Sequence, residues 1–312
     1  EDHEAFRSSV KEFLDREVLV KGSMTLIDTE RAVSLYSALG NAIEMSGGSA
    51  ANTMVGIASF GGRAAYVGKV NDDELGEVFG HDLRAVGVAF RSAQPDSAVP
   101  TGRCIIVVTP DAQRTMNTYL GVSSLFSPPD IDADVVAAGK VLYMEGYLYD
   151  RHPAKEAFRV AASIAHANGR QVSLTLSDSF CVDRHRSDFR GLVADEIDIL
   201  FGNEAELMSL YEVDDFDAAV AAVGRDCSLA AITRGARGCV VVTPDGLIPV
   251  AAEPVDRVLD TTGAGDLFAS GFLYGYTQGI DLAECARLGS LAASEVISHV
   301  GARPLIELKT LL

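Results

Sequence analysis

Positively charged side chains are scarce in this chain. Its 312 residues include 26 Lys and Arg against 44 Asp and Glu, which gives a formal net charge of −18 at pH 7. Proteins that bind nucleic acids or anionic membranes contact the phosphates with clustered Lys and Arg. The composition therefore predicts neither a nucleic-acid partner nor a membrane partner, and the acidity mainly indicates solubility.

Cysteine pairs and long apolar runs are also absent. No run of 18 apolar residues occurs, and residues 1–20 are too charged for a signal peptide. The histidines show no metal-ligand spacing, and the five cysteines are scattered without a C-x-x-C pair, at Cys104, Cys181, Cys227, Cys239 and Cys285. Neither a zinc site nor a disulfide framework is indicated, so we expect a protein of the reducing cytoplasm.

Strand-like and helical runs alternate from about residue 135 onward. Helical patterns include an Ala-rich stretch that ends at Asn168, one around Val182–Val193, and two closing helices from Ala264 and Asp281. The strands expected between them are Lys140–Tyr147, Gln171–Leu176, Glu196–Phe201 and Leu229–Thr233. Strands joined by crossover helices run parallel, so this half predicts an α/β fold with a mainly parallel central sheet.

Shorter strand-like pieces precede this region, joined by Gly, Pro and Asp and interrupted by a helix after Gly48. They are Leu19–Ile27, Ala42–Ser46, Pro100–Thr109 and Arg114–Leu120. We expect them to form a small sheet that covers a cleft. The alternative is that they extend the main sheet.

The most informative segment is the turn DTTGAGDLF at residues 260–268. Two glycines flank Ala264, and they leave no side chain to keep an anion from the first free amides of the following helix. Asp266, beside such an anion site, is placed to take a proton from an attacking hydroxyl. The turn therefore predicts phosphoryl transfer to an alcohol. A glycine-rich helix start needed only for tight packing is the simpler alternative.

Two other phosphate-binding motifs do not fit the sequence. A dinucleotide fingerprint needs a third Gly or Ala where Phe268 stands, and a P-loop needs Ser or Thr after Gly-Lys, whereas Val70 follows Gly68 and Lys69. An NAD-dependent oxidoreductase is therefore disfavoured.

A second glycine pair, Gly47 and Gly48, precedes a helix whose first turn carries Asn52. Backbone amides and an amide side chain are suited to gripping vicinal hydroxyls. The alternative is an ordinary helix start capped by Ser46 or Ser49.

Two further segments follow expected strands. Asn203 and Glu206 face the same side of a first helical turn, where a carboxylate can hold the water shell of Mg²⁺. An N-cap Asn with Glu at N3 predicts the same residues. The turn TRGARG at residues 233–238 either lies against nucleotide phosphates or is a solvated hairpin turn.

These motifs together resemble the PfkB/ribokinase family of carbohydrate and nucleoside kinases. The likeness runs from about Val20 to Pro304, and the motif at 260–266, the Gly-Gly pair with Asn52, Asn203-x-x-Glu206 and Thr233-x-Gly235 occur in the family's order. The resemblance implies a ribokinase-like three-layer α/β/α sandwich over residues 1–312. It also implies a discontinuous β-sheet lid drawn from about 15–30, 40–46 and 96–122.

The resemblance also implies roles for individual residues. Asp266 becomes the general base, with Gly263, Ala264 and Gly265 forming the anion hole. Substrate hydroxyls would contact Gly47, Gly48 and Asn52, while Glu206 would hold Mg²⁺ through water. The residues expected near ATP and its phosphates are Asn203, Glu206, Thr233, Gly235, Gly238, Gly263 and Gly265. A K⁺ ion near Asp260 and the loop 298–302 is left open, as is the choice between a monomer and a homodimer formed through the lid.

Within the family, PTGRC at residues 100–104 and FGNE at 201–204 look most similar to adenosine kinases. This likeness implies that Cys104 lies on a lid strand near the nucleoside and that Tyr147 stacks on a base. Glu145, polar in an apolar strand, either makes a specific contact or is a sheet-edge carboxylate. A sugar kinase acting on ribose, fructose or a sugar acid, and a non-catalytic nucleoside-binding protein of the same fold, are the alternatives.

The chain departs from the family's pattern at its start. Members usually begin with a β-strand that ends in Gly-Asn…Asp, whose Asp binds the sugar, whereas this chain starts at Glu1-Asp2-His3 and already reads as the following helix. Asp28 lies too late for that role. We expect that the first strand was removed or lies outside the sequence given, and its loss would remove a central strand and a sugar-binding carboxylate.

Overall fold

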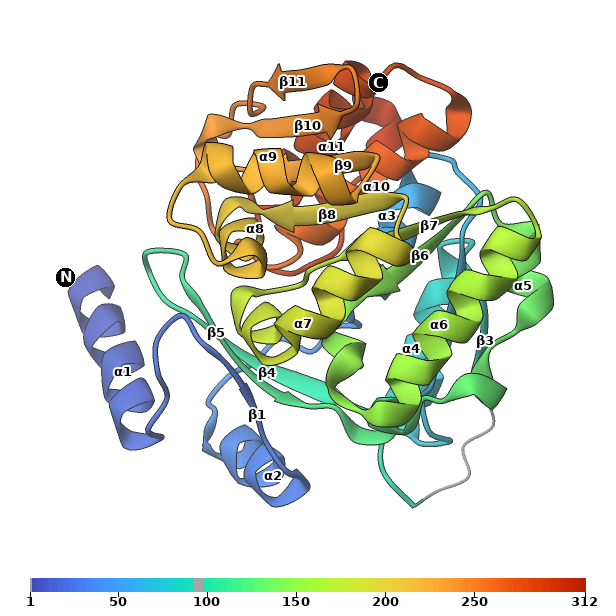
Figure 1. Cartoon of the computed structure of the whole chain (residues 1–312). Helices are drawn as coiled ribbons and strands as arrows, with labels where there is room; N and C mark the ends of the chain where they lie inside the picture. Colours follow the sequence, from blue (N-terminus) through green and yellow to red (C-terminus); the bar gives the residue numbers. More distant parts are fainter. Residues whose placement is uncertain (1, 93–97) are drawn as a thin grey trace.

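The computed structural model describes residues 2–92 and 98–312 (Figure 1). Residues 96–97 of the predicted lid lie outside these ranges. None of the helices described has the length and apolar character of a membrane span.

A six-stranded sheet forms the centre of the molecule (Figure 1). In spatial order its strands are β11 (Gly246–Val250), β10 (Cys239–Thr243), β9 (Leu229–Thr233), β8 (Ile199–Asn203), β7 (Gln171–Thr175) and β6 (Val141–Glu145). Strands β6 to β9 are parallel, whereas β10 pairs antiparallel with both β9 and β11. The mainly parallel sheet expected from the sequence is thus present.

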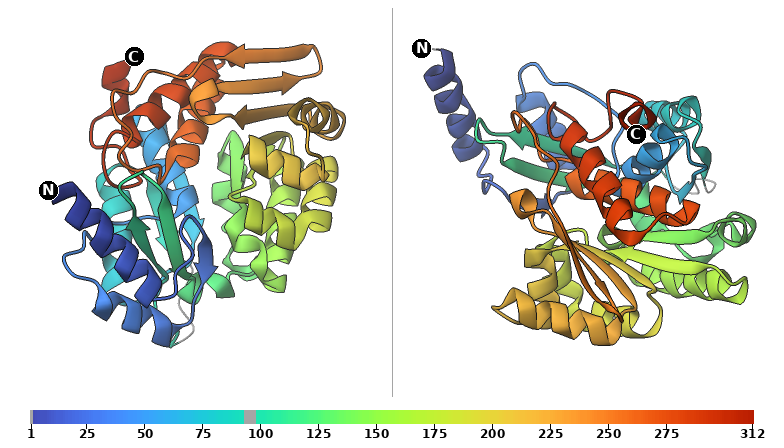
Figure 2. Two further views of the ribbon diagram at one scale, coloured as in Figure 1. Left: turned by 90° about the vertical axis from the view of Figure 1, so that its left-hand side faces the viewer. Right: turned by 90° about the horizontal axis from the view of Figure 1, so that it is seen from above.

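Helices cover both faces of this sheet and complete three layers (Figures 1 and 2). One face carries α5 (Ala133–Ala138), α6 (His152–Ala167), α7 (Ser179–Asp195), α8 (Glu204–Tyr211) and α9 (Phe216–Asp226). The other carries α3 (Ser49–Ser59), α10 (Ala264–Gln278) and α11 (Leu282–Val296). The first core includes Phe158, Phe189 and Leu207, and the second joins Phe268 and Phe272 to the sheet.

A separate three-stranded sheet stands beside the central one, as the lid expectation requires. It has the order β1 (Met24–Leu26), β5 (Arg114–Tyr119), β4 (Arg103–Val108), with β1 parallel and β4 antiparallel to β5. Helices α1 (Asp2–Arg16) and α2 (Thr29–Ala38) lie on its outer side (Figure 1).

Two of the predicted lid strands need correction. Ala42–Ser46 is not a strand. Its polar side chains bind residues of neighbouring helices: Ser46 Oγ donates to Asp82 at 2.6 Å, and Glu44 accepts from Tyr36. The strand predicted at Leu19–Ile27 shrinks to three residues, because a turn with Gly22 at φ 79° interrupts its first half.

The remaining elements are small. Strands β2 (Ala65–Gly68) and β3 (Ala89–Ser92) form a parallel pair connected by α4 (Glu74–Ala85). In the described ranges no strand joins the outer edge of β6 or bonds this pair to the central sheet. Five short 3₁₀ turns are η1 (Gly121–Leu125), η2 (Pro128–Asp130), η3 (Gly146–Asp150), η4 (Gly235–Arg237) and η5 (Leu308–Leu311).

The helix starts differ in a way that concerns function. An aspartate side chain caps the N-terminal amides of α2, α4, α5, α7, α9 and α11. Helices α3 and α10 begin instead at Gly48 and Gly263, with φ of 89° and 81° and no side-chain cap. Uncapped amides at a helix start attract anions. At α3 the Ala50 amide is already bound by the Glu145 carboxylate, whereas the start of α10 remains open to a ligand.

Candidate active site

A cleft of about 2500 Å³ lies between the small sheet, the start of α3 and the ends of the central strands. It brings together nearly all the residues that the sequence singled out. Its lining includes Gly47, Gly48, Asn52, Cys104, Tyr147, Asn203, Glu206, Thr233, Gly235, Gly263, Ala264, Gly265 and Asp266. Gly238 is not part of this lining.

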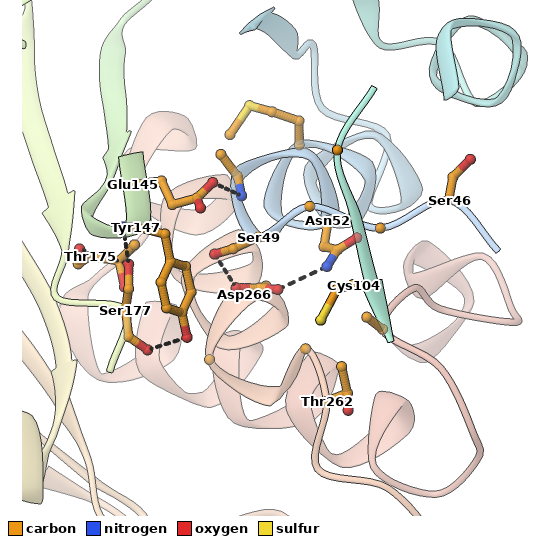
Figure 3. A pocket seen from close by; sticks show the side chains of 18 of the residues that line it. Ser46, Ser49, Asn52, Cys104, Glu145, Tyr147, Thr175, Ser177, Thr262 and Asp266 are labelled. Atoms are coloured by element: carbon orange, nitrogen blue, oxygen red, sulfur yellow. Dashed lines mark hydrogen bonds between the residues drawn. The ribbon is translucent and has the colours of Figure 1, made fainter. Parts of the chain in front are cut away.

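Asp266 lies in the first turn of α10, where two side chains from α3 hold its carboxylate (Figure 3). Ser49 Oγ donates to Asp266 Oδ1 at 2.7 Å, and Asn52 Nδ2 donates to Oδ2 at 2.9 Å. Burial raises the pKa of Asp266, and the hydrogen bonds from Asn52 and Ser49 oppose that rise. The result is a carboxylate that lines the cleft and is held in one orientation by α3, as a general base needs.

The amides at the start of α10 adjoin this carboxylate. Leu267 N is the first to bond back into the helix, to the Gly263 carbonyl at 2.8 Å, so the amides of Gly265 and Asp266 have no helical acceptor. The amide of Ala264 makes a long bond of 3.3 Å to the Thr261 carbonyl. Gly265 is exposed and would meet nothing within 4 Å of an added Cβ. An anion can therefore approach this helix start.

The two glycines of this turn should respond differently to an added methyl group. In Gly263→Ala the side chain would be strained at φ 81° and would lie 2.7 Å from the Ala302 carbonyl oxygen, so we expect a loss of about 2 kcal/mol in the free energy of unfolding. Gly265→Ala meets no such contact and keeps its stability, but the methyl fills the anion's space and lowers kcat/KM about tenfold or more. Urea unfolding and steady-state kinetics on both variants measure this. Equal stability of the two, or full activity of Gly265→Ala, would contradict it.

A second carboxylate faces Asp266 from the end of β6. Glu145 Oε2 accepts from the Ala50 amide at 3.0 Å, in the first turn of α3 (Figure 3). Burial and, to a lesser extent, the nearby Asp266 charge raise the pKa of Glu145 to about 7, although the hydrogen bond from the Ala50 amide opposes the rise. Of the two readings left open by the sequence, the contact with α3 favours a specific role in the cleft over a bare sheet-edge carboxylate.

The raised pKa of Glu145 makes stability depend on pH. The carboxyl has an ordinary pKa of 4.5 and a folded value of about 7, so between these values the folded state binds more protons than the unfolded state. Stability therefore falls as the pH rises from about 5 to about 8. Glu145→Gln cannot ionise but keeps an oxygen for Ala50, and we expect it to lessen that fall by about 2 kcal/mol. Urea unfolding at both pH values measures this, and an unchanged slope would exclude Glu145 as a cause.

Tyr147, in η3, forms part of the cleft wall. Its backbone amide donates to Ser177 Oγ at 3.2 Å and its hydroxyl donates to the Ser177 carbonyl at 3.1 Å (Figure 3). Ser177 itself adopts φ 72°, a conformation that a non-glycine residue rarely takes. Cys104 reaches the cleft from lid strand β4, where its Sγ accepts from Thr118 Oγ1 at 3.2 Å.

Asn203 and Glu206 form a capping box at the start of α8. Asn203 Oδ1 accepts from the Glu206 amide at 2.9 Å, and Glu206 Oε2 accepts from the Asn203 amide at 2.9 Å. The capping alternative is therefore realised, while the pair also lines the cleft. Glu206 is only 6% exposed, and burial raises its pKa to about 7.

The turn after β9 reaches the cleft only at its beginning. Thr233 and Gly235 line the cleft. An added Cβ at Gly238 would collide with the Val250 carbonyl of β11, so packing of the hairpin explains that glycine. The arginines of the turn, Arg234 and Arg237, pair with Glu204.

Two arginines at the site carry no role in the sequence-based prediction. Arg114, at the start of β5, donates from Nη1 to the Thr261 carbonyl at 2.7 Å and so links the lid to the Asp266 turn. Arg303 donates from Nε to Asn52 Oδ1 at 3.2 Å. Neither arginine belongs to a recognisable sequence motif. The one indication in the sequence is that Arg114 places a charged side chain in a strand that is half-buried.

The loop at residues 298–302 is tied to the same turn through Asp260. This carboxylate is 2% exposed and accepts from the amides of Thr262 at 2.9 Å and Gly301 at 3.1 Å. Across residues 2–92 and 98–312, no three His, Cys, Asp or Glu side chains come together as metal ligands. The K⁺ ion left open by the sequence stays a prediction.

Comparisons with known proteins decide the family. A family model described as "pfkB family carbohydrate kinase" matches residues 16–309. The chain belongs to the PfkB family. Members of this family are kinases, phosphotransferases with alcohol acceptors, so the resemblance drawn from the sequence is confirmed.

Two solved structures resemble this PfkB kinase over nearly its whole length. The adenosine kinase from Sinorhizobium meliloti has a TM-score of 0.93 and 53% identity, covering 96% of this chain and 92% of that chain. A probable sugar kinase protein from Rhizobium etli CFN 42 has a TM-score of 0.93 and 50% identity, covering 96% and 91%. Adenosine kinase 1 of Arabidopsis thaliana is 26% identical, over 93% of this chain and 90% of its own length. The ribokinase-like fold expected from the sequence is thereby confirmed.

Proposed function

We propose that this PfkB kinase transfers the γ-phosphate of ATP to the 5′-hydroxyl of adenosine, giving AMP and ADP. The observation that carries the proposal is the Asp266 carboxylate, held by Ser49 and Asn52 beside the unbonded amides at the start of α10. The 53% identity to the Sinorhizobium meliloti adenosine kinase supports adenosine as the acceptor.

The reaction needs one proton acceptor and one anion site. The 5′-oxygen attacks the γ-phosphorus, the bond from that phosphorus to the β–γ bridging oxygen breaks, and the hydroxyl proton passes to Asp266. We assign the amides of Gly263, Ala264 and Gly265 the role of stabilising the negative charge on the transferred phosphoryl group. Because such amides are already oriented, they stabilise that charge without reorganisation. Arg114, whose charge acts on Asp266, adds a cation from the lid.

The acceptor's place follows from the walls of the cleft. We assign the ribose hydroxyls to Gly47, Gly48 and Asn52, at the start of α3. Tyr147, fixed at both its amide and its hydroxyl by Ser177, offers a ring face to the base. Cys104 approaches from the lid, whose closure would keep water from the γ-phosphate.

Glu206 is a buried carboxylate that lines the cleft. This fits Mg²⁺, which keeps several waters and takes few protein ligands beside substrate phosphates. When bound, the ion neutralises charge on the phosphates. We assign Glu206 to it through water, with Asn203, Thr233 and Gly235 near ATP.

A sugar kinase is the second candidate function, and Glu145 is the observation that favours it. Its carboxylate reaches the same part of the cleft as Asp266 and could accept hydrogen bonds from a free sugar. The probable sugar kinase protein from Rhizobium etli is similar to this chain. A non-catalytic nucleoside-binding protein is disfavoured because Asp266 and its partners are intact.

A screen for ADP release separates these functions. The protein is incubated with ATP and Mg²⁺ and with adenosine, other nucleosides, ribose, fructose or sugar acids, and kcat/KM is compared. The proposal expects the highest value for adenosine. A higher value for a sugar would establish the second candidate, and nucleoside binding without ADP from any acceptor would leave a binding protein.

A further inference from the structure

Arg303 reaches from the loop after α11 to the start of α3. Its Nε donates to Asn52 Oδ1 at 3.2 Å, and its Nη2 donates to the Gly47 carbonyl at 3.1 Å. The guanidinium also lies 5.9 Å from the centroid of the Phe79 ring. Arg303 is half-buried and is not part of the cleft lining, so it stands behind residues assigned to the substrate.

The loop that carries Arg303 is itself fixed. Asp260 accepts from the Gly301 amide at 3.1 Å, two residues before Arg303, and Gly301 adopts φ 115°. The arginine therefore approaches α3 from a backbone anchored to the Asp266 turn. A guanidinium presents its donors in a rigid planar fork, which suits the simultaneous contacts with Asn52 and Gly47.

The contact with Asn52 decides which way its amide faces. An asparagine amide has an accepting oxygen and a donating nitrogen, and the two ends are similar in shape. Arg303 has only donors, so it binds Oδ1 and leaves Nδ2 for Asp266 Oδ2, 2.9 Å away. A reversed amide would set Nδ2 against the guanidinium and Oδ1 against a carboxylate, and both contacts would be repulsive.

We propose that Arg303 is a positioning residue that fixes the Asn52 amide so that it donates to the Asp266 carboxylate. The inference rests on the proposed function, in which Asp266 is the general base. Arg303 acts through Asn52, because its guanidinium binds Asn52 Oδ1, whereas the side chains that donate to Asp266 are Ser49 and Asn52.

We call the chain of contacts from Arg303 through Asn52 to Asp266 the relay. Other titratable or charged groups lie near Asp266 and near Arg303. Asp266 is faced by Glu145 and Tyr143 of β6, Tyr147 of η3 and Arg114 of β5. Asp82 of α4 and Tyr66 of β2 face Arg303. Loss of the Arg303 charge also raises the pKa values of Asp82 and Tyr66. An effect through these two groups does not pass through Asn52 and would persist in an Asn52→Ala background.

The kinetic test compares Arg303→Met and Arg303→Lys with wild type, using adenosine and ATP. Without the guanidinium the Asn52 amide keeps only the Asp266 contact, so its donation to the carboxylate is held less firmly. We expect Arg303→Met to lower kcat about tenfold and to move the acid limb of the kcat/KM profile up by roughly one pH unit. Lysine keeps the charge with a single point of contact and should give a smaller shift. The exposed Arg159→Met serves as the matched control and should match wild type. An unmoved acid limb in Arg303→Met would overturn the proposal.

A double-mutant cycle distinguishes a relay from a general loss of structure. In an Asn52→Ala background, Arg303→Met should cause no further shift of the acid limb, because the residue through which it acts is gone. An equal shift in both backgrounds would contradict the relay.

A measurement that does not depend on catalysis separates the role of Arg303 from the proposed kinase function. The difference in unfolding free energy between wild type and Asp266→Asn, followed against pH, reports the titration of Asp266 in the folded protein. We expect its midpoint to rise when the same pair is compared in the Arg303→Met background. If wild type phosphorylates no acceptor, the proposed function fails, while this midpoint still decides the role of Arg303.

Discussion

Replacing Asp266 with Asn lowers turnover by at least ~10²-fold and leaves adenosine binding nearly intact. The amide has almost the shape of the carboxylate, so Ser49 and Asn52 stay in place, but it cannot accept the proton of the attacking hydroxyl. The variant also removes a buried charge, so it should fold at least as stably as wild type. Steady-state ADP release gives kcat, and isothermal titration gives the adenosine affinity.

Asp245→Asn is the matched control for this experiment. Asp245 is exposed in the turn between β10 and β11 and does not line the cleft, so its loss should change neither quantity. Near-normal turnover in Asp266→Asn would refute its assignment as the base. A large loss of adenosine affinity together with turnover would instead make Asp266 chiefly a binding residue.

Replacing Arg114 with Met should lower kcat by about 10²-fold, the effect of removing one oriented donor from a charge-stabilising site. Arg114 connects lid strand β5 with Thr261 at 2.7 Å, and its charge acts on both Asp266 and Glu206. Without it, the lid loses this hydrogen bond to the turn at 260–266, and the proposed transition state loses a cation. Because Arg114 is half-buried, the free energy of unfolding should change little.

Arg114→Lys and the exposed Arg159→Met complete this comparison. Lysine retains the charge without the planar fork, so its kcat should lie between those of wild type and Arg114→Met. Arg159→Met should behave as wild type. A kcat within about twofold of wild type in Arg114→Met would confine Arg114 to a structural role.

The parts of the site that lie within one short segment were predictable. The turn at 260–266 joins a helix start, two glycines and a carboxylate, and each has a local physical meaning that does not depend on the rest of the fold. The same holds for Asn203 and Glu206, although the pattern could not separate capping from ligand binding because both use the same geometry. Strands β7 and β9 were predictable from their apolar runs.

The parts that depend on tertiary contacts were not predictable. Arg114 comes from a lid strand and Arg303 from a C-terminal loop, and each meets its partner across more than a hundred residues of sequence. Ala42–Ser46 has the composition of a strand, but no neighbouring edge pairs with it, and Ser46 and Glu44 bind side chains from helices instead. Glu145 was visible as a polar residue in an apolar strand, while its partner Ala50 was not.

The most direct test follows the γ-phosphate itself. Wild-type protein is incubated with Mg²⁺, adenosine and ATP labelled in the γ-phosphate, and the labelled product is identified. The account predicts label on the 5′-oxygen of AMP, no label in ADP, and almost no transfer by Asp266→Asn. Label that appears only in inorganic phosphate, or that stays in ATP with every alcohol of the screen, would contradict it.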